Sequence, residues 1–365
     1  MKFTAILPTD LAVGAKLPFD VFTRDGTLLL TRGSLVGSEA TRLYLLENAQ
    51  RVAQRRQQLS GSVFERTQKL AERLARIEED HRPGVADAAW VARVRALARD
   101  LVELVDEDAH AAFAAMHLDI HHRYDVLHHI VAAQVCALLG LLARLNGGER
   151  ISLVCAALTH DLGLLGDRAR VEASECLSDS ARRLIREHCS KGVALLRTVG
   201  VDDGLWLKVV AEHHERLDGS GYAGLCADQL DLPSRVMSLA DSFSAMLRHR
   251  PYRERIEAGN ALADLYADPQ GKYDQGLVSH LVNELGLYPP GSVLRLASNE
   301  TAVSIRPTPG EIRHPVIAAI ADRHGRPMYR AVMRDSRNEE NAIIGLLPLE
   351  KVGPVRKLLP ACWNR

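Results

Sequence analysis

Histidine is the residue type with the most chemical potential in this sequence. The chain has 15 histidines, and 11 of them lie between His110 and His249. A neutral imidazole is the commonest metal ligand among side chains, and it also exchanges protons near neutral pH. This stretch is therefore predicted to hold a metal centre or an acid–base site.

Two aspartates lie in the same part of the sequence, one directly after an apolar segment and one inside another. His160 and Asp161 follow the apolar run from Ile151 to Leu158, and Asp241 lies within an otherwise apolar helical pattern. A buried carboxylate is costly unless a positive charge, such as a metal ion, compensates it. Five imidazoles and two carboxylates can satisfy two metal centres if one carboxylate bridges them. The candidate ligands are His128, His160, Asp161, His188, His213, His214 and Asp241.

Nitrogen and oxygen donors without thiolate suit iron, manganese, nickel or zinc. A pair of such ions can activate water against a phosphorus centre while neutralising the phosphate oxygens. Taken singly, each residue has a simpler explanation. A histidine at a helix end is commonly a polar group near the last carbonyls, and Asp241 could cap a helix or pair with an arginine. The joint order of the seven residues favours the metal site.

This order resembles the HD-GYP family, a branch of the HD phosphohydrolases that hydrolyses cyclic di-GMP. The resemblance spans residues 118–287, and its most specific part is the string His-His-Glu-Arg-Leu-Asp-Gly-Ser-Gly-Tyr at 213–222. It implies an all-α domain that holds two divalent transition metal ions. Iron or manganese is favoured, with nickel or zinc as alternatives.

The resemblance also implies a role for each matching position. One metal ion would be held by His128, His160, Asp161 and Asp241. Asp161 would bridge to a second ion held by His188, His213 and His214. The catalytic pair would be His160 and Asp161, and the dinucleotide would contact Gly221, Tyr222, Arg250 and Arg253. The two arginines suit this role because a planar guanidinium grips phosphate bidentately.

Four positions depart from the family pattern. Leu164 stands where the family carries a lysine, and losing one electrostatic donor of this kind can cost about 10²–10³ in rate. Ala223 replaces the proline of the Gly-Tyr-Pro signature, which concerns loop rigidity more than chemistry. Tyr124 replaces a carboxylate that supports a third metal in some members, so a two-metal site is expected. Ser244 replaces an aspartate, with no consequence that the sequence explains.

The other histidines and the six cysteines are expected outside the metal site. His129 is expected on the helix surface or behind a ligand, and His121 and His122 are expected to face solvent. The cysteines form no Cys-x-x-Cys pair, so they are interpreted as reduced packing residues, Cys189 included.

The elements that position these residues are predicted to be mainly helical. Residues 110–287 carry long aliphatic segments with few turn signals, and one helix is expected to run past His128 through Leu145. Before them, residues 63–105 repeat apolar side chains at spacings of three and four, with a break at 81–84. The stripe at 91–105 suits core packing, which is favoured, or a dimer seam.

Two small β units are predicted to flank the helices. Asp25-Gly26 between two apolar runs indicates a hairpin, followed by a short helix at 38–46. After residue 291 the pattern predicts strands at 292–296, 301–306, 316–321 and 327–333. The expected parts are a β-rich module at 1–60, a helical linker at 61–117, the HD-GYP-like domain at 118–288 and a β unit at 289–365.

Composition limits the class of protein. A length of 365 residues suits two or three domains, and the 46 Lys and Arg balance the 46 Asp and Glu. Zero formal charge argues against binding to a nucleic acid polymer or a membrane through net charge. No apolar run approaches the roughly 18 residues of a spanning helix, and the first ten residues do not suit a signal peptide. A cytoplasmic protein without a membrane span is expected.

The favoured interpretation is a metal-dependent phosphodiesterase of bacterial signalling that opens cyclic di-GMP to linear pGpG, with GMP as a further product. The alternative is a weak or inactive module that senses the dinucleotide or docks a protein, because Leu164 removes a charge. An HD hydrolase of another nucleotide is a third hypothesis. Besides cyclic di-GMP, the expected partners are a protein such as a diguanylate cyclase and a second copy in a homodimer.

Overall fold

The computed structural model describes residues 3–6, 11, 13–17, 20–23, 25–31, 33–52, 61–81, 87–165, 178–247 and 255–363. The chain divides into two compact units, Met1–Ser60 and Gly61–Arg365. Arg250 and Arg253 lie outside the described residues, so their contact with the dinucleotide stays a prediction.

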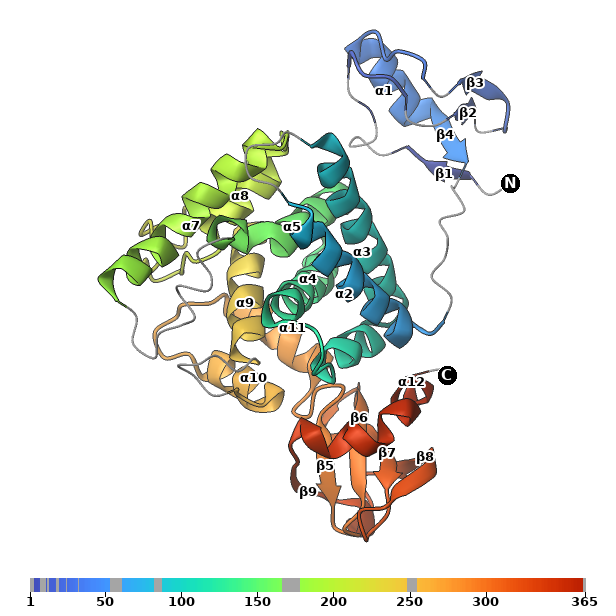
Figure 1. Cartoon of the computed structure of the whole chain (residues 1–365), viewed down its shortest axis with the longest axis vertical. Coiled ribbons are helices and arrows are strands. Elements are labelled where there is room, and N and C mark those ends of the chain that lie inside the picture. The colour runs from blue at the N-terminus through green and yellow to red at the C-terminus, as the bar shows by residue number, and fades with distance from the viewer. Residues whose placement is uncertain are drawn as a thin grey trace. The chain divides into compact units, whose positions relative to one another are not determined.

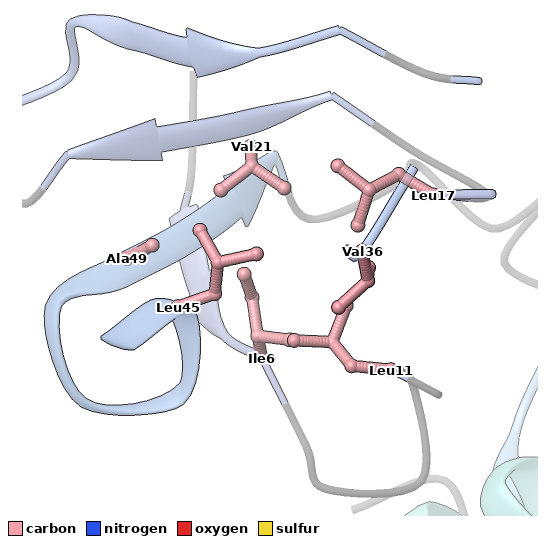
Figure 2. Close-up of a cluster of buried hydrophobic side chains, with 7 residues drawn as sticks. All are labelled: Ile6, Leu11, Leu17, Val21, Val36, Leu45 and Ala49. Carbon is pink, nitrogen blue, oxygen red and sulfur yellow. The ribbon is translucent and has the colours of Figure 1, made fainter. Parts of the chain in front are cut away.

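The first unit is a small β-rich module. Its antiparallel sheet has the strand order β1 (Phe3–Ala5), β4 (Ala49–Val52), β2 (Val21–Thr23) and β3 (Leu28–Leu30). The predicted hairpin is present as β2 and β3, and the predicted short helix is α1 (Glu39–Asn48), which Ser38 caps. Figure 2 shows the core that joins the helix to the sheet, formed by Ile6, Leu11, Leu17, Val21, Val36, Leu45 and Ala49.

The second unit begins with a helical layer (Figure 1). Its helices are α2 (Val63–Glu79), α3 (Ala88–His117), α4 (Tyr124–Leu142), α5 (Gly147–Thr159), α7 (Asp179–Thr198), α8 (Gly204–Glu212), α9 (Leu232–Met246), α10 (Ala258–Ala267) and α11 (Gln275–Leu285), and the 3-10 turn η2 (His160–Leu164) follows α5. The predicted mainly α fold is confirmed. Helix α2 ends at the predicted break, whereas α4 ends earlier than the expected Leu145 because Arg144 takes a positive φ of 59°.

Helix α4 is the centre of this layer. Helices α3, α5 and α9 pack against it. By length and composition α4 could cross a membrane, so the expectation that no apolar run approaches this length is wrong. However, 83% of its most apolar window is buried inside the protein. Its apolar side chains are therefore accounted for by the core that they form with the neighbouring helices.

A five-stranded antiparallel sheet follows the helices. Its order is β8 (Pro327–Asp335), β7 (Glu311–Ala321), β6 (Thr301–Thr308), β5 (Val293–Leu296) and β9 (Ile343–Leu346). The four predicted strands are present, and β9 is an addition that pairs with β5. The chain continues through η3 (Glu339–Asn341), η4 (Leu349–Leu358) and α12 (Leu359–Cys362).

Specific contacts join this sheet to the helices. Arg306 on β6 lies 3.3 Å from Asp108, the single residue of α3 with non-helical dihedral angles (φ −158°, ψ 92°). Trp363 stacks on Phe64 of α2 and donates its indole hydrogen to the carbonyl oxygen of Ile305. These contacts hold the sheet and the segment after α12 against the start of α2 and the kink of α3.

Candidate metal centre

The seven candidate ligands come from five neighbouring elements. Helix α4 contributes His128 and α7 contributes His188, while α9 contributes Asp241. The turn η2 contributes His160 and Asp161, and His213 and His214 end α8. The structure brings all seven together, although they are spread over more than a hundred residues of sequence.

Three of these residues form one compact donor group. Nε2 of His128 lies 3.3 Å from Oδ1 of Asp241, and Nε2 of His160 lies 3.6 Å from the same oxygen. The two imidazole nitrogens are 3.1 Å apart. Two ligands about 2.1 Å from one metal ion and at right angles to each other are about 3 Å apart, so this spacing fits a shared ion.

Asp161 lies between this group and the other histidines. Its Oδ1 is 3.5 Å from Nε2 of His188 and 4.0 Å from Nε2 of His160. Its Oδ2 is 4.0 Å from Nε2 of His128. The two carboxylate oxygens therefore face different sets of nitrogen donors, as the expected bridging role requires.

The remaining histidines form a second group that also reaches the first. Nε2 of His188 and Nε2 of His213 are 3.0 Å apart. His214 packs its ring 4.2 Å from that of His213, but its Nδ1 lies 3.3 Å from Oδ2 of Asp241. The resemblance did not imply this contact. Asp241 thus presents one oxygen to each group, and Asp161 also lies near histidines of both groups.

The second ring nitrogen of four histidines is held by a fixed acceptor. For His160, His188 and His213, Nδ1 donates to the carbonyl oxygens of Ala157, Ile185 and Val210. For His128, Nδ1 lies 2.9 Å from the hydroxyl oxygen of Ser244. Each proton then sits on Nδ1 and each Nε2 presents a lone pair to the cluster, which is the arrangement of metal-binding histidines.

Protonation states agree with this arrangement. Burial lowers the pKa of His128 to about 3, and it also lowers the pKa values of His188 and His213. Burial opposes ionisation of Asp241, but the nearby His214, together with His128 and His160, holds its pKa well below the usual range. Neutral imidazoles beside an ionised carboxylate are the forms that bind a divalent ion.

Gly163 lets η2 approach α7 closely. A Cβ atom at this position would lie 2.0 Å from the carbonyl oxygen of His188. Any larger residue would push η2 away from α7, and with it Asp161 away from His188. The glycine after the His-Asp pair is therefore needed for packing that shapes the site.

The loop that carries Gly221 and Tyr222 is organised by Glu215. The Glu215 side chain is buried, and its carboxylate accepts from the backbone N–H groups of Ala223 at 2.8 Å and Leu225 at 2.9 Å. A Cβ at Gly221 would lie 2.5 Å from Cα of Glu215, so the glycine permits this close contact. Tyr222 is 43% exposed, and its ring is 4.7 Å from that of His214. Tyr222 is thus positioned to touch a molecule bound at the cluster.

Of the two positions expected for His129, the helix surface is wrong, and the residue lies behind Asp161. Its side chain is only 6% exposed, because α2 packs over this part of α4. Nδ1 of His129 lies 2.7 Å from Oε1 of Glu78, and Nε2 lies 3.6 Å from Oδ2 of Asp161. Burial lowers the pKa of His129, but the neighbouring carboxylates of Asp161 and Glu78 outweigh this effect and raise the pKa to about 9. Sequence reasoning missed Glu78, which carries no motif.

Two other expectations are settled near the site. His121 is exposed as expected, whereas His122 is half-buried with Nδ1 2.8 Å from Oδ2 of Asp119. Cys189 lies beside the second group, with Sγ 3.7 Å from Nε2 of His188. Burial raises the pKa of this thiol to about 12, so it stays protonated in the metal-free protein.

Helices that converge histidine and aspartate side chains in this way define a helical metal-binding domain. The chain belongs to the HD domain family, whose family model matches residues 88–277. The family assignment made from the sequence is thereby confirmed. HD domains bind divalent metal ions, and the clustered side chains could hold them.

Characterised relatives cover only part of this chain. The sequence is 29% identical to the cyclic di-GMP phosphodiesterase PA4108 of Pseudomonas aeruginosa, over 56% of this chain and 51% of that protein. It is 30% identical to the 3′3′-cGAMP-specific phosphodiesterase 3 of Vibrio cholerae, over 43% of this chain and 35% of that protein. The match therefore spans about half or less of each relative.

The fold is also that of a solved HD structure. Bd1817, an HDG"Y"P protein from Bdellovibrio bacteriovorus, superposes with a TM-score of 0.52 at 16% sequence identity. The superposition covers 77% of this chain and 98% of that one. The fold of most of this chain is therefore shared with a solved protein.

Proposed function

We propose that the chain is a metal-dependent phosphodiesterase that hydrolyses cyclic di-GMP to linear pGpG. The observation that supports this most directly is the convergence of four histidines on Asp161 and Asp241, with His213 beside His188; the four are His128, His160, His188 and His214. Relatives named as cyclic dinucleotide phosphodiesterases support the substrate class.

The proposed chemistry divides between the metal centre and the side chains around it. Two bound divalent ions, iron or manganese by the resemblance, would supply charge stabilisation to a phosphodiester and activate water against phosphorus. His128, His160 and Asp241 would hold one ion and His188, His213 and His214 the other, with Asp161 between them. Tyr222 would orient the substrate from the exposed edge of the cluster, and Arg250 and Arg253 would grip its phosphates.

The experiment is a hydrolysis assay on protein purified without oxygen and loaded with Mn²⁺ or Fe²⁺. Cyclic di-GMP and 3′3′-cGAMP are offered separately, and the products are separated by chromatography. We expect pGpG from cyclic di-GMP, and no product from Asp161→Asn, because the amide cannot bridge two ions as a carboxylate does. Faster turnover of 3′3′-cGAMP would reassign the substrate, and a metal-loaded protein that cleaves neither would refute the proposal.

A second function is favoured by one observation. Leu164 follows the His160-Asp161 pair at the position of the family's lysine, and its side chain offers no charge to a phosphate. A protein that binds cyclic di-GMP with its metal ions in place but does not cleave it would be a sensor or a docking module. In that case a protein such as a diguanylate cyclase, or a second copy of the chain, would be the partner to seek.

A further inference from the structure

Glu78 and His129 form a buried pair at the edge of the metal centre. Glu78 comes from α2, and its side chain is 9% exposed. One of its oxygens contacts Nδ1 of His129 at 2.7 Å, and the other lies 3.1 Å from a guanidinium nitrogen of Arg123. The carboxylate is therefore oriented from both sides, and it fixes the orientation of the imidazole ring.

The other nitrogen of His129 points toward the centre. Nε2 is buried and makes no hydrogen bond within the described part of the chain. Oδ2 of Asp161 lies 3.6 Å from it, and the ring meets that of His160 edge-on at 4.9 Å between centroids. Donor atoms of His129, His160 and Asp161 all lie within 4.8 Å of one another. A buried polar atom without a hydrogen bond is uncommon, and an ion at this position would satisfy it.

We infer that His129 is a further metal ligand, on the Oδ2 side of Asp161, and that Glu78 is its positioning residue. This inference rests on the metal centre of the proposed function. Tyr124, which replaces the carboxylate that supports a third ion in some HD-GYP proteins, stacks on His128 at 5.6 Å. His129 lies on the same helix and offers a nitrogen donor, and the family pattern does not include this donor. Carboxylate–imidazole pairs of this kind commonly raise the basicity of a metal ligand.

A rival role for His129 is purely structural. The ring would then remain a cation between Glu78 and Asp161 whether or not metal is bound, and would stabilise the fold as a buried ion pair. The two roles predict different effects of metal binding on the protonation of His129. A ligand must release its proton to solvent when the ion binds, whereas a purely structural ion pair keeps its proton and does not take part in coordination.

The experiment measures metal binding by the whole chain with three variants. His129→Phe removes both nitrogens and keeps a ring, and Glu78→Gln keeps a hydrogen-bond acceptor but removes the charge. His121→Ala removes an exposed histidine on the loop before α4 and is the matched control. Mn²⁺ affinity and stoichiometry are measured by titration, and the Co²⁺ absorption spectrum reports the number and type of ligands.

We expect His129→Phe to lose one bound Mn²⁺ or to weaken its binding about 10–100-fold, and to change the Co²⁺ spectrum. Glu78→Gln should shift the affinity in the same direction by a smaller factor, and His121→Ala should match the wild type. Unchanged affinity, stoichiometry and spectrum in both His129→Phe and Glu78→Gln would overturn the inference, even if the melting temperature falls. Metal bound by the wild type without hydrolysis would refute only the proposed function, whereas hydrolysis with unaltered metal binding in His129→Phe would refute only this inference.

Discussion

The hydroxyl oxygen of Ser244 lies 2.9 Å from Nδ1 of His128. Ser244 donates its own hydrogen to the carbonyl oxygen of Asp241, also at 2.9 Å, so its oxygen is left to accept the proton of the imidazole. This contact leaves the lone pair of His128 on Nε2, which faces His160 and Asp241. The serine that replaces the family's aspartate therefore orients a candidate metal ligand through a neutral acceptor.

Ser244→Ala is expected to weaken metal binding about tenfold or more, because His128 loses the acceptor that sets its tautomer. Ser244→Asp should bind metal at least as tightly as the wild type, since a carboxylate accepts the same proton. Competition titration with a metal chelator measures both affinities. Ser279→Ala, which removes a hydroxyl on α11, is the control, and equal affinities for Ser244→Ala and this control would contradict the assigned role.

Glu215→Gln should disturb substrate binding more than metal binding. One amide oxygen must replace two carboxylate oxygens that accept from Ala223 and Leu225, and the NH₂ group then faces a backbone N–H. Losing charge-assisted bonds of this kind costs about 1.5–3 kcal/mol, which would loosen the loop that carries Tyr222. We expect a raised KM for cyclic di-GMP with unchanged metal content. Loss of metal at an unaltered KM would show that the loop does not meet the substrate.

Leu164→Lys tests the departure that most affects turnover. A lysine at this half-buried position adds the positive charge that the family places beside the phosphate, so kcat should rise by up to about 10²-fold. Leu165→Lys adds the same charge one residue later and is the control. Steady-state kinetics on metal-loaded protein separates the two. If neither lysine variant nor the wild type turns over, while all bind cyclic di-GMP, the sensor function replaces the enzymatic one.

The stability of the metal-free protein should decrease toward acid pH and also toward alkaline pH. Burial lowers the pKa of His128 from 6.5 to about 3, so below pH 6.5 the unfolded chain takes up a proton that the folded chain refuses. The free energy of unfolding then falls with falling pH, by up to about 1.4 kcal/mol per pH unit for this group. His188 and His213 shift the same way.

His129 acts in the opposite direction. Its pKa in the folded chain is about 9, so the stability that this group contributes is lost as the pH rises from 6.5 through 9. Calorimetry with a chelator present should therefore show a melting temperature that falls on both sides of neutrality. His129→Phe should remove the decline on the alkaline side and keep the acid one. A wild-type melting temperature that is constant from pH 4.5 to 6.5 would contradict the buried neutral histidines.

Much of this protein follows from local sequence signals. The break after Glu79, the Asp25-Gly26 hairpin and four strands of the second sheet were predictable, because turn residues and apolar spacing act over a few positions. The convergence of the seven candidate ligands was also foreseen, since the order of the motifs resembles a known family. Strand β9 was missed because its four residues carry no alternation, and its strand state depends on pairing with β5.

Only the tertiary structure decided how the ligands are supported. Glu78 and His129 are 51 residues apart, and Ser244 and His128 are 116 apart, so no local pattern connects either pair. Apolar spacing shows that a face of α4 is buried, but it does not show which helix covers that face or which polar side chain it brings. The chain alone therefore determined which donors are available. The packing of α9 and α2 on α4 brought Ser244 to His128 and Glu78 to His129, and so determined which nitrogen of these two histidines faces the centre.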